Sequence, residues 1–283
     1  MSTPRHDHAG KRGFVLVSVL WLGTFLIVLL AALLQQGRVT LAVTRTGLGE
    51  VTADAMLTAS LELLAARLAG GGTAADGDGR AKSERSANGT VLVAAQDMNG
   101  LVDLNRAPAP LIAALAAAAR DDRAADAILA RRASPGAPVQ SPFRSREELA
   151  DADGVTPEAA AFAADYTTVF ATNGTINPLT APVAVLRLLP GVDAAVAAKI
   201  VAVREHSLSD SGPVFALLPG TSALVAPAPL NAYDVYIEAT VTGGLTKSVR
   251  ATMLFDGDAS RPYRLLDWHP WAARPAWVRR GAD

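Results

Sequence analysis

The sequence predicts an α+β protein in which a long N-terminal helix is followed by an antiparallel sheet, with an all-α region inserted between the strands of that sheet. Three observations lead to this prediction. Residues 14–34 carry no charge, residues 90–96 and 232–241 have strand patterns, and residues 98–228 between them are mostly helical in pattern. Helical and strand segments are therefore segregated rather than alternating, which favours α+β over a parallel α/β fold.

The first element is a helix long enough to cross a bilayer. The uncharged run at residues 14–34 covers roughly 30 Å at about 1.5 Å per residue. Ahead of it lie Arg5, Lys11 and Arg12 with a single acid, Asp7. This excess of basic residues predicts a cytoplasmic N-terminus and an exported remainder. A plain single-pass anchor and a cleaved secretory signal peptide are the alternative interpretations of such a run.

The helix is expected to continue beyond the apolar run, to about Leu68. Apolar residues recur there at helical spacing, with charged residues off the stripe: Leu41, Leu48, Val51, Ala55, Ala59, Leu63 and Ala66. Three glycines at residues 70–72 end the pattern, and residues 73–89 are expected to form a polar loop.

The helical region contains an internal repeat. The segments that begin at Gly100 and Gly174 align without gaps at an offset of 74 residues, and both contain an Ala-Pro pair before an apolar helix. Residues 143–170 are expected to be helical as well. We interpret the aligned segments as a duplicated helical unit.

The C-terminal part returns to strands. Along residues 234–241, four apolar residues alternate with Asp234, Tyr236, Glu238 and Thr240, as in a strand with one buried face. A Gly-Gly turn follows, then a second strand near residues 248–256 and a third near 261–268.

One stretch resembles a helix-hairpin-helix motif. It contains Leu189-Pro190-Gly191-Val192 before a helix. In DNA-binding copies, glycines let backbone N–H groups approach a phosphate, and nearby basic residues neutralise it. Asp193 occupies the second glycine position here, and no basic stripe accompanies it. We expect compact helix packing and a protein-binding surface, and no nucleic-acid partner.

The composition and the absence of known catalytic motifs exclude several classes of function. The chain has 283 residues, a formal net charge of −1 and no cysteine. Disulfides and thiol chemistry are therefore excluded, and no basic field attracts polyanions. No nucleophile triad, zinc-protease motif, phosphate loop or dinucleotide fingerprint is found in the sequence. We predict that the protein is not an enzyme.

The junction at Gly13 and Phe14 carries a family resemblance. A basic leader that ends in Lys11-Arg12-Gly13 and is followed at once by Phe14 and an apolar helix resembles the signal of type IV pilins and type II secretion pseudopilins. The resemblance implies that a prepilin peptidase cuts after Gly13 and methylates the new N-terminal Phe14. It also implies that the long helix stays on the product as anchor and spine.

The fifth residue of the mature chain, counted from Phe14, indicates which member of the family the sequence resembles. The family nearly always has Glu there, and this chain has Ser18. The Glu is thought to contact the N-terminal amine of the subunit above it in the fibre. The K component of type II secretion characteristically lacks this Glu, and the order of spine, strand, helical insertion and strands is similar to that component. The resemblance implies a minor pseudopilin at the fibre tip, where the helical region would obstruct a subunit above.

The resemblance also sets the expected organisation and partners. We expect a single-pass inner-membrane protein with periplasmic domains, whose partners are other minor pseudopilins, the prepilin peptidase, the secretin and the exported substrate. A membrane-anchored DNA receptor of the competence type is the alternative, supported only by residues 174–206. The predicted divisions are a leader at 1–13, the membrane part of the spine at 14–34, the amphipathic spine, loop and first strand at 35–97, the all-α insertion at 98–228, the C-terminal strands at 229–268 and a tail at 269–283.

Calcium is the only cofactor that the sequence suggests. Some pseudopilins of the K type bind it, and carboxylate oxygens are its preferred ligands. The candidates are two acidic pairs, Asp151 with Asp153 and Asp256 with Asp258. Phe162 stands where an EF-hand loop starting at Asp151 would need its last ligand. We therefore favour acidic residues of solvated loops and expect no other cofactor.

Overall fold

The computed structural model describes residues 9–133, 142–206, 211–218, 220–221, 223–257 and 261–279, with the side chains of 9–16, 33–34 and 36–46 outside the description. The chain divides into two compact units, Met1–Thr52 and Ala53–Asp283. Each unit is described by itself below.

Helix α1 (Ala9–Ala69) begins in the first unit and ends in the second. In the first unit, the described large apolar side chains from Val17 to Leu30 are 45–73% exposed. Within the residues whose side chains are described, no helix is long and apolar enough to cross a membrane. The helix ends at three glycines, as predicted, and Gly70 and Gly72 donate backbone hydrogen bonds to the carbonyls of Ala66 and Leu68.

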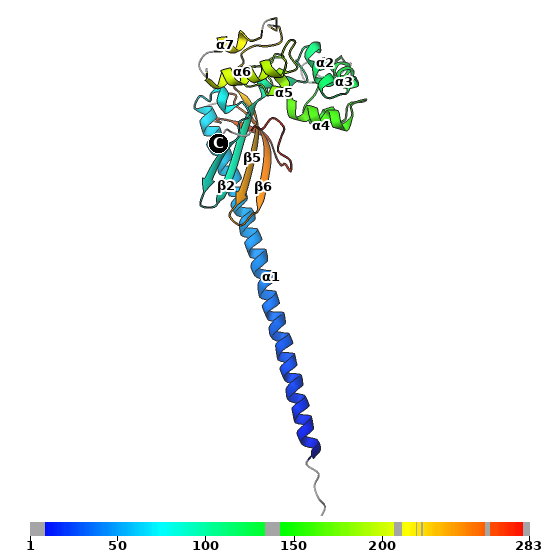
Figure 1. Ribbon diagram of the computed structural model, residues 1–283, viewed down its shortest axis with the longest axis vertical. Coiled ribbons are helices and arrows are strands. Elements are labelled where there is room, and N and C mark those ends of the chain that lie inside the picture. Colours follow the sequence, from blue (N-terminus) through cyan, green and yellow to red (C-terminus); the bar gives the residue numbers. More distant parts are fainter. Residues whose placement is uncertain are drawn as a thin grey trace, which may run out of the picture. The chain divides into compact units, whose positions relative to one another are not determined.

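In the second unit, the last turns of α1 cover one face of a five-stranded antiparallel sheet (Figure 1). The strands are β1 (Lys82–Ser86), β2 (Gly89–Asp97), β5 (Ala232–Val241), β6 (Thr246–Leu254) and β7 (Arg264–Pro270), in that order across the sheet. Leu57, Leu61 and Leu64 of the helix join the apolar residues of β2, β5 and β6 in one core. The helix is amphipathic here, but the predicted apolar stripe is not the buried one. Leu48, Val51 and Leu63 are 64%, 68% and 53% exposed, and the stripe that contains Leu57, Leu61 and Leu64 packs on the sheet instead.

The helical region leaves the sheet at the end of β2 and returns at the start of β5, where Asp97 pairs with Tyr233. It is built around its own core, to which Leu111, Phe143 and Ile200 belong. Its elements are η2 (Met98–Gly100), β3 (Val102–Asp103), α2 (Ala109–Ala118), α3 (Asp122–Ala133), η3 (Glu147–Leu149), α4 (Pro157–Tyr166), β4 (Thr167–Thr168), α5 (Val183–Leu186), α6 (Ala194–His206) and α7 (Gly212–Phe215). Strands β3 and β4 pair in parallel.

The predicted fold class is confirmed: helices and an antiparallel sheet are segregated, and the helical elements lie between β2 and β5. The six predicted divisions of the chain stay predictions. Two predictions of secondary structure were wrong. Residues 82–86, assigned to a polar loop, form β1, whose five side chains are all exposed and therefore show no apolar alternation. Residues 143–170 are helical only in η3 and α4, because the turn at Gly154, with φ +88°, and Pro157 divide them.

Candidate functional site: the junction and the surfaces around the sheet

A buried carboxylate joins the helical region to the sheet. Asp234 of β5 is 0% exposed, and its Oδ2 lies 2.5 Å from Nη1 of Arg146 and 2.6 Å from Nη2 of Arg250 on β6. Arg146 belongs to the helical region, where it precedes η3. Burial alone would raise the pKa of Asp234, but Arg146 and Arg250 outweigh it and hold that pKa at about 2. The carboxylate is therefore charged and shared by both parts of the fold.

Arg250 extends this network to α4 and to residues 271–279, which follow β7 and are called the C-terminal segment below. Its Nη1 lies 3.2 Å from Oδ1 of Asp165, and its guanidinium is 4.9 Å from the ring centroid of Trp271. The other oxygen of Asp165 accepts a 2.8 Å hydrogen bond from the backbone N–H of Ala276. One residue further, Trp277 is 1% exposed and packs with Ala94 and Tyr236. The C-terminal segment therefore covers part of the sheet face opposite α1.

A second buried carboxylate lies at the end of β2. Oδ1 of Asp97 accepts the backbone N–H of Asn99 at 3.0 Å, and Oδ2 accepts the hydroxyl of Thr180 at 2.8 Å and the amide of Asn177 at 3.3 Å. Burial raises the pKa of Asp97 to about 6 despite these hydrogen bonds. The helical region is thus held to the sheet by two polar networks, at Asp97 and at Asp234.

The predicted duplication is present in the backbone of two turns. Ala107 N–H donates to the carbonyl of Asp103, and Ala181 N–H donates to that of Asn177, both at 3.0 Å and 74 residues apart. Helices α2 and α5 then begin after Pro108 and Pro182, which have nearly identical backbone angles. Each turn is also closed by the first side chain, because Asp103 accepts the N–H of Asn105 and Asn177 that of Leu179.

Each copy of the turn is capped by an arginine from a later helix. Arg132, at the end of α3, donates to the carbonyls of Leu104, Ala107 and Asp103 at 2.6, 2.7 and 3.1 Å. Arg204, near the end of α6, donates to the carbonyls at the equivalent positions, Pro178 and Ala181. The duplicated unit is therefore a turn, a helix and a second helix that returns an arginine to the turn.

Replacing Arg132 tests the strength of this cap. Arg132→Met keeps much of the side-chain length but leaves the partly buried carbonyls without their charged donor. We expect the free energy of unfolding to fall by about 1.5–3 kcal/mol, as is typical for hydrogen bonds to a charged group. Urea unfolding of the full chain in detergent micelles measures it. The control Arg123→Met alters an exposed arginine of the same helix and should change stability by less than about 0.5 kcal/mol.

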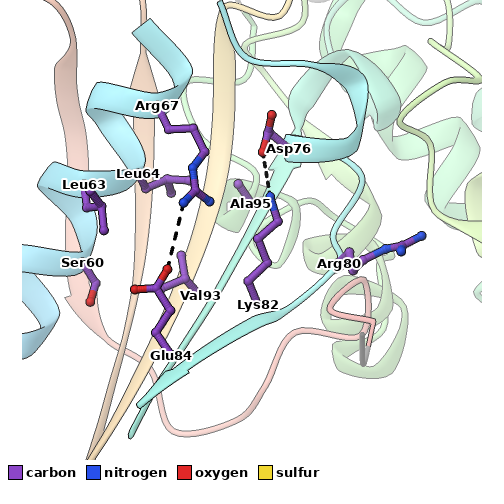
Figure 2. A pocket seen from close by; sticks show the side chains of 10 residues that line it. All are labelled: Ser60, Leu63, Leu64, Arg67, Asp76, Arg80, Lys82, Glu84, Val93 and Ala95. Atoms are coloured by element: carbon purple, nitrogen blue, oxygen red, sulfur yellow. Dashed lines mark hydrogen bonds and ion pairs between the residues drawn. The ribbon is translucent and has the colours of Figure 1, made fainter. Parts of the chain in front are cut away.

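On its β1 side, α1 is bordered by a small polar hollow (Figure 2). In Figure 2, Arg67 faces Glu84 and Lys82 faces Asp76, while Arg80 points away from the helix. The first ion pair has an N–O distance of 4.0 Å and the second of 2.7 Å. The hollow encloses only ≈ 30 Å³, room for little more than water. Charged side chains therefore close this flank of the helix.

The structure places the predicted leader and spine residues on α1. The backbone of Lys11, Arg12, Gly13 and Phe14 is helical, and the side chains of these residues lie outside the description. Ser18 is on the same helix and exposed. Cleavage and methylation at this junction, and the significance of Ser18, stay predictions.

The acidic pairs do not form a metal site within the described residues. Asp151 and Asp153 are exposed in the turns before α4, Asp256 is exposed and pairs with Arg264 at 3.0 Å, and Asp258 lies outside the description. No group of three or more His, Asp or Glu side chains that could hold a metal ion is found in the described part of the chain. Calcium binding has no further support from these residues.

The junction residues could not be identified from the sequence pattern. Asp234 and Tyr236 were assigned to an exposed face of their strand, and this was wrong: they are 0% and 1% exposed. The helical region and the C-terminal segment cover that face. A sequence signal did exist, since Asp234 and Arg250 belong to consecutive strands, but their register depends on the turn between them.

Comparison with known proteins gives a likeness in fold to solved structures. No family model matches the chain, and no curated protein matches it. Among solved structures, the fold is similar to a chain in the crystal structure of the GspK-GspI-GspJ complex from the enterotoxigenic Escherichia coli Type 2 Secretion System. The TM-score is 0.55 at 13% identity, over 81% of this chain and 99% of that chain. At this identity the likeness is one of fold.

Proposed function

We propose that the protein is a non-catalytic minor pseudopilin of a type II secretion system, similar to the K component. The observation that carries the proposal is the fold likeness to a chain of the GspK-GspI-GspJ complex over 81% of this chain. The order of elements agrees with the proposal, since a long N-terminal helix is followed by a sheet whose strands are interrupted by the duplicated helical unit. The partners proposed on this basis are other minor pseudopilins.

The Gly13–Phe14 junction supports the processing part of the proposal. Prepilin peptidase would cut after Gly13 and methylate Phe14, and residues 14–34 would anchor the product in the inner membrane with its folded domain in the periplasm. The uncharged run matches the thickness of a bilayer core, and the basic leader matches a cytoplasmic N-terminus.

The tip position is supported by the residue type at Ser18. Without a carboxylate there, the chain lacks the group that other pseudopilins use to contact the subunit above. A chain of this kind suits the end of a fibre, where it would help initiate assembly and contact the secretin or the exported substrate.

Intact-mass and N-terminal analysis tests the proposal. The full chain is expressed with and without an active prepilin peptidase and extracted from the membrane. We expect the peptidase to remove residues 1–13 and to leave a methylated Phe14. A Gly13→Asp variant should stay uncut, since it replaces the glycine after which the peptidase is proposed to cut. An uncut wild-type chain, beside a control pilin that is cut, would refute the pseudopilin assignment.

A further inference from the structure

The last strand of the sheet has a free and apolar edge. Among the described residues, β7 pairs with β6 and with no other strand. Leu265, Leu266 and Trp268 on this strand are 42%, 41% and 36% exposed. An edge strand presents unpaired backbone N–H and C=O groups, and exposed apolar residues beside them make it prone to pair with another chain.

The opposite edge of the same sheet is protected. Strand β1 has only five residues, Lys-Ser-Glu-Arg-Ser, and all five are exposed. Short length and charged side chains are the usual means by which proteins prevent pairing at an edge. Strand β7 also has charged residues, ends at Pro270 and contains a bulge at Leu266. Unlike β1, it exposes three large apolar side chains, and this difference indicates that the edge of β7 has a use.

Hollows flank β7 on both faces of the sheet. Trp268 pairs with Ala251, a residue of the core beneath α1, and lines a groove of ≈ 540 Å³ with Leu57, Val249 and Pro270. Asp267 pairs with Thr252, which points to the opposite face. There Asp267 and Leu266 line a pocket of ≈ 230 Å³ whose other walls include Met98, Val169 and Phe170.

We propose that the outer edge of β7 binds an extended strand of a different protein by β-strand addition. Backbone hydrogen bonds would join the two strands. Successive side chains of an added strand point to opposite faces, so they would enter the groove and the pocket in turn. This arrangement uses the free edge and both hollows together, whereas a helix laid along α1 would use the groove alone.

The charge of β7 argues against a second copy of this chain as the occupant. Asp267 is the middle residue of Arg264–Pro270. Two copies paired antiparallel about a two-fold axis over the whole strand would therefore place Asp267 opposite Asp267. Like charges directly opposite in a sheet are destabilising. Asp267 lies 2.8 Å from Nδ1 of His269 in the same strand and is 49% exposed. Its exposed part favours a partner strand with Lys or Arg opposite it and apolar residues on either side. The inference uses only residues of the unit Ala53–Asp283 and does not rest on the proposed function.

A random peptide library tests the inference on the full chain in detergent micelles. Peptides about nine residues long can cover β7 with one residue beyond each end. We expect selection to enrich peptides with a basic residue flanked by apolar ones. Leu266→Lys should weaken the selected peptides at least tenfold by fluorescence anisotropy. Glu84→Lys, on the protected edge, should leave their affinity unchanged. Both positions are exposed, and thermal melting verifies that each variant folds.

Two N-methylated isomers of the best peptide separate strand pairing from simple burial in a groove. An extended peptide directs alternate N–H groups to its two edges. Methylation of one alternate set should therefore weaken binding at least tenfold, and methylation of the other set should not. The inference is overturned if no peptide is enriched, if both isomers bind alike, or if Leu266→Lys binds as well as wild type. A wild-type dimer in sedimentation analysis that Leu266→Lys dissociates would overturn it in favour of a second copy.

Discussion

Asp234→Asn is expected to lower the free energy of unfolding by about 3–5 kcal/mol, the usual cost of breaking a buried ion pair by removing one partner. The wild-type carboxylate is fully buried and is shared by Arg146, which is 7% exposed, and Arg250, which is 1% exposed. An asparagine would keep the shape but leave two buried guanidinium groups facing a neutral amide. Because these arginines belong to the helical region and to the sheet, both parts should lose stability together.

Chemical denaturation in detergent micelles, followed by tryptophan fluorescence, measures this effect. Asp267→Asn is the matched control, since it neutralises a half-exposed carboxylate on β7 of the same sheet and should cost less than about 1 kcal/mol. If Asp234→Asn unfolds at the same denaturant concentration as the control, the network does not hold the junction together.

The pH dependence of the same variant checks the charge on Asp234. Its folded pKa is held at about 2, below the ordinary value of 3.8 for an aspartic acid. A carboxyl with a depressed folded pKa contributes stability above its unfolded pKa, and that contribution is lost as the pH falls through the folded value. The difference in stability between wild type and Asp234→Asn should therefore be constant above pH 4 and shrink between about pH 4 and pH 2.

Much of the fold could be predicted because each main element has a periodic pattern. Strand β5 buries the regular set of apolar residues that the sequence predicts. For α1 the helix was predicted but its buried side was not, because apolar residues lie on more than one side: Val51 and Leu63 of the predicted stripe are exposed, and Leu61 is buried. Strand β1 has no such pattern because all its residues are exposed, and its existence depends on pairing with β2. The break inside residues 143–170 was missed because the apolar residues on either side of Gly154 happen to continue a helical spacing.

The contact between the helical region and the sheet could not be predicted, for a different reason. Whether Asp234 faces solvent or a buried arginine depends on what covers its face of the sheet, and the covering segments, at Arg146 and Trp277, are distant in sequence. Alternation along a strand identifies two faces but not how many of them are buried. The repeat of Gly100 and Gly174, in contrast, was visible as an alignment, and only the structure gives its physical reason.

That reason is reciprocal packing between the two copies of the turn. A Cβ atom on Gly174 would lie 2.1 Å from the carbonyl oxygen of Arg106 in the first copy. A Cβ atom on Gly100 would lie 2.9 Å from the backbone nitrogen of Ala181 in the second copy. Because Ala181 follows Thr180, the position equivalent to Arg106, each glycine contacts the turn of the other copy. Only glycine allows the two backbones to approach this closely.

Gly174→Ala should therefore destabilise the protein strongly. The added methyl group would overlap backbone atoms, which cannot move aside as the end of a side chain can, so we expect a loss of about 3 kcal/mol in the free energy of unfolding, the upper part of the range for overpacking. Gly100→Ala should cost less, since two of the atoms it would meet, Oγ1 of Thr180 and Nε2 of Gln96, belong to side chains.

Gly47→Ala is the control, because its Cβ atom would meet nothing within 4 Å on helix α1 and alanine is favoured over glycine in a helix by about 0.5–1 kcal/mol. Urea unfolding of the three variants should give the order Gly47→Ala, Gly100→Ala, Gly174→Ala from most to least stable. Equal stability of Gly174→Ala and Gly47→Ala would show that the two turns do not pack as described. The expected order would mean that the two copies constrain each other, because a substitution in one copy acts through the backbone of the other.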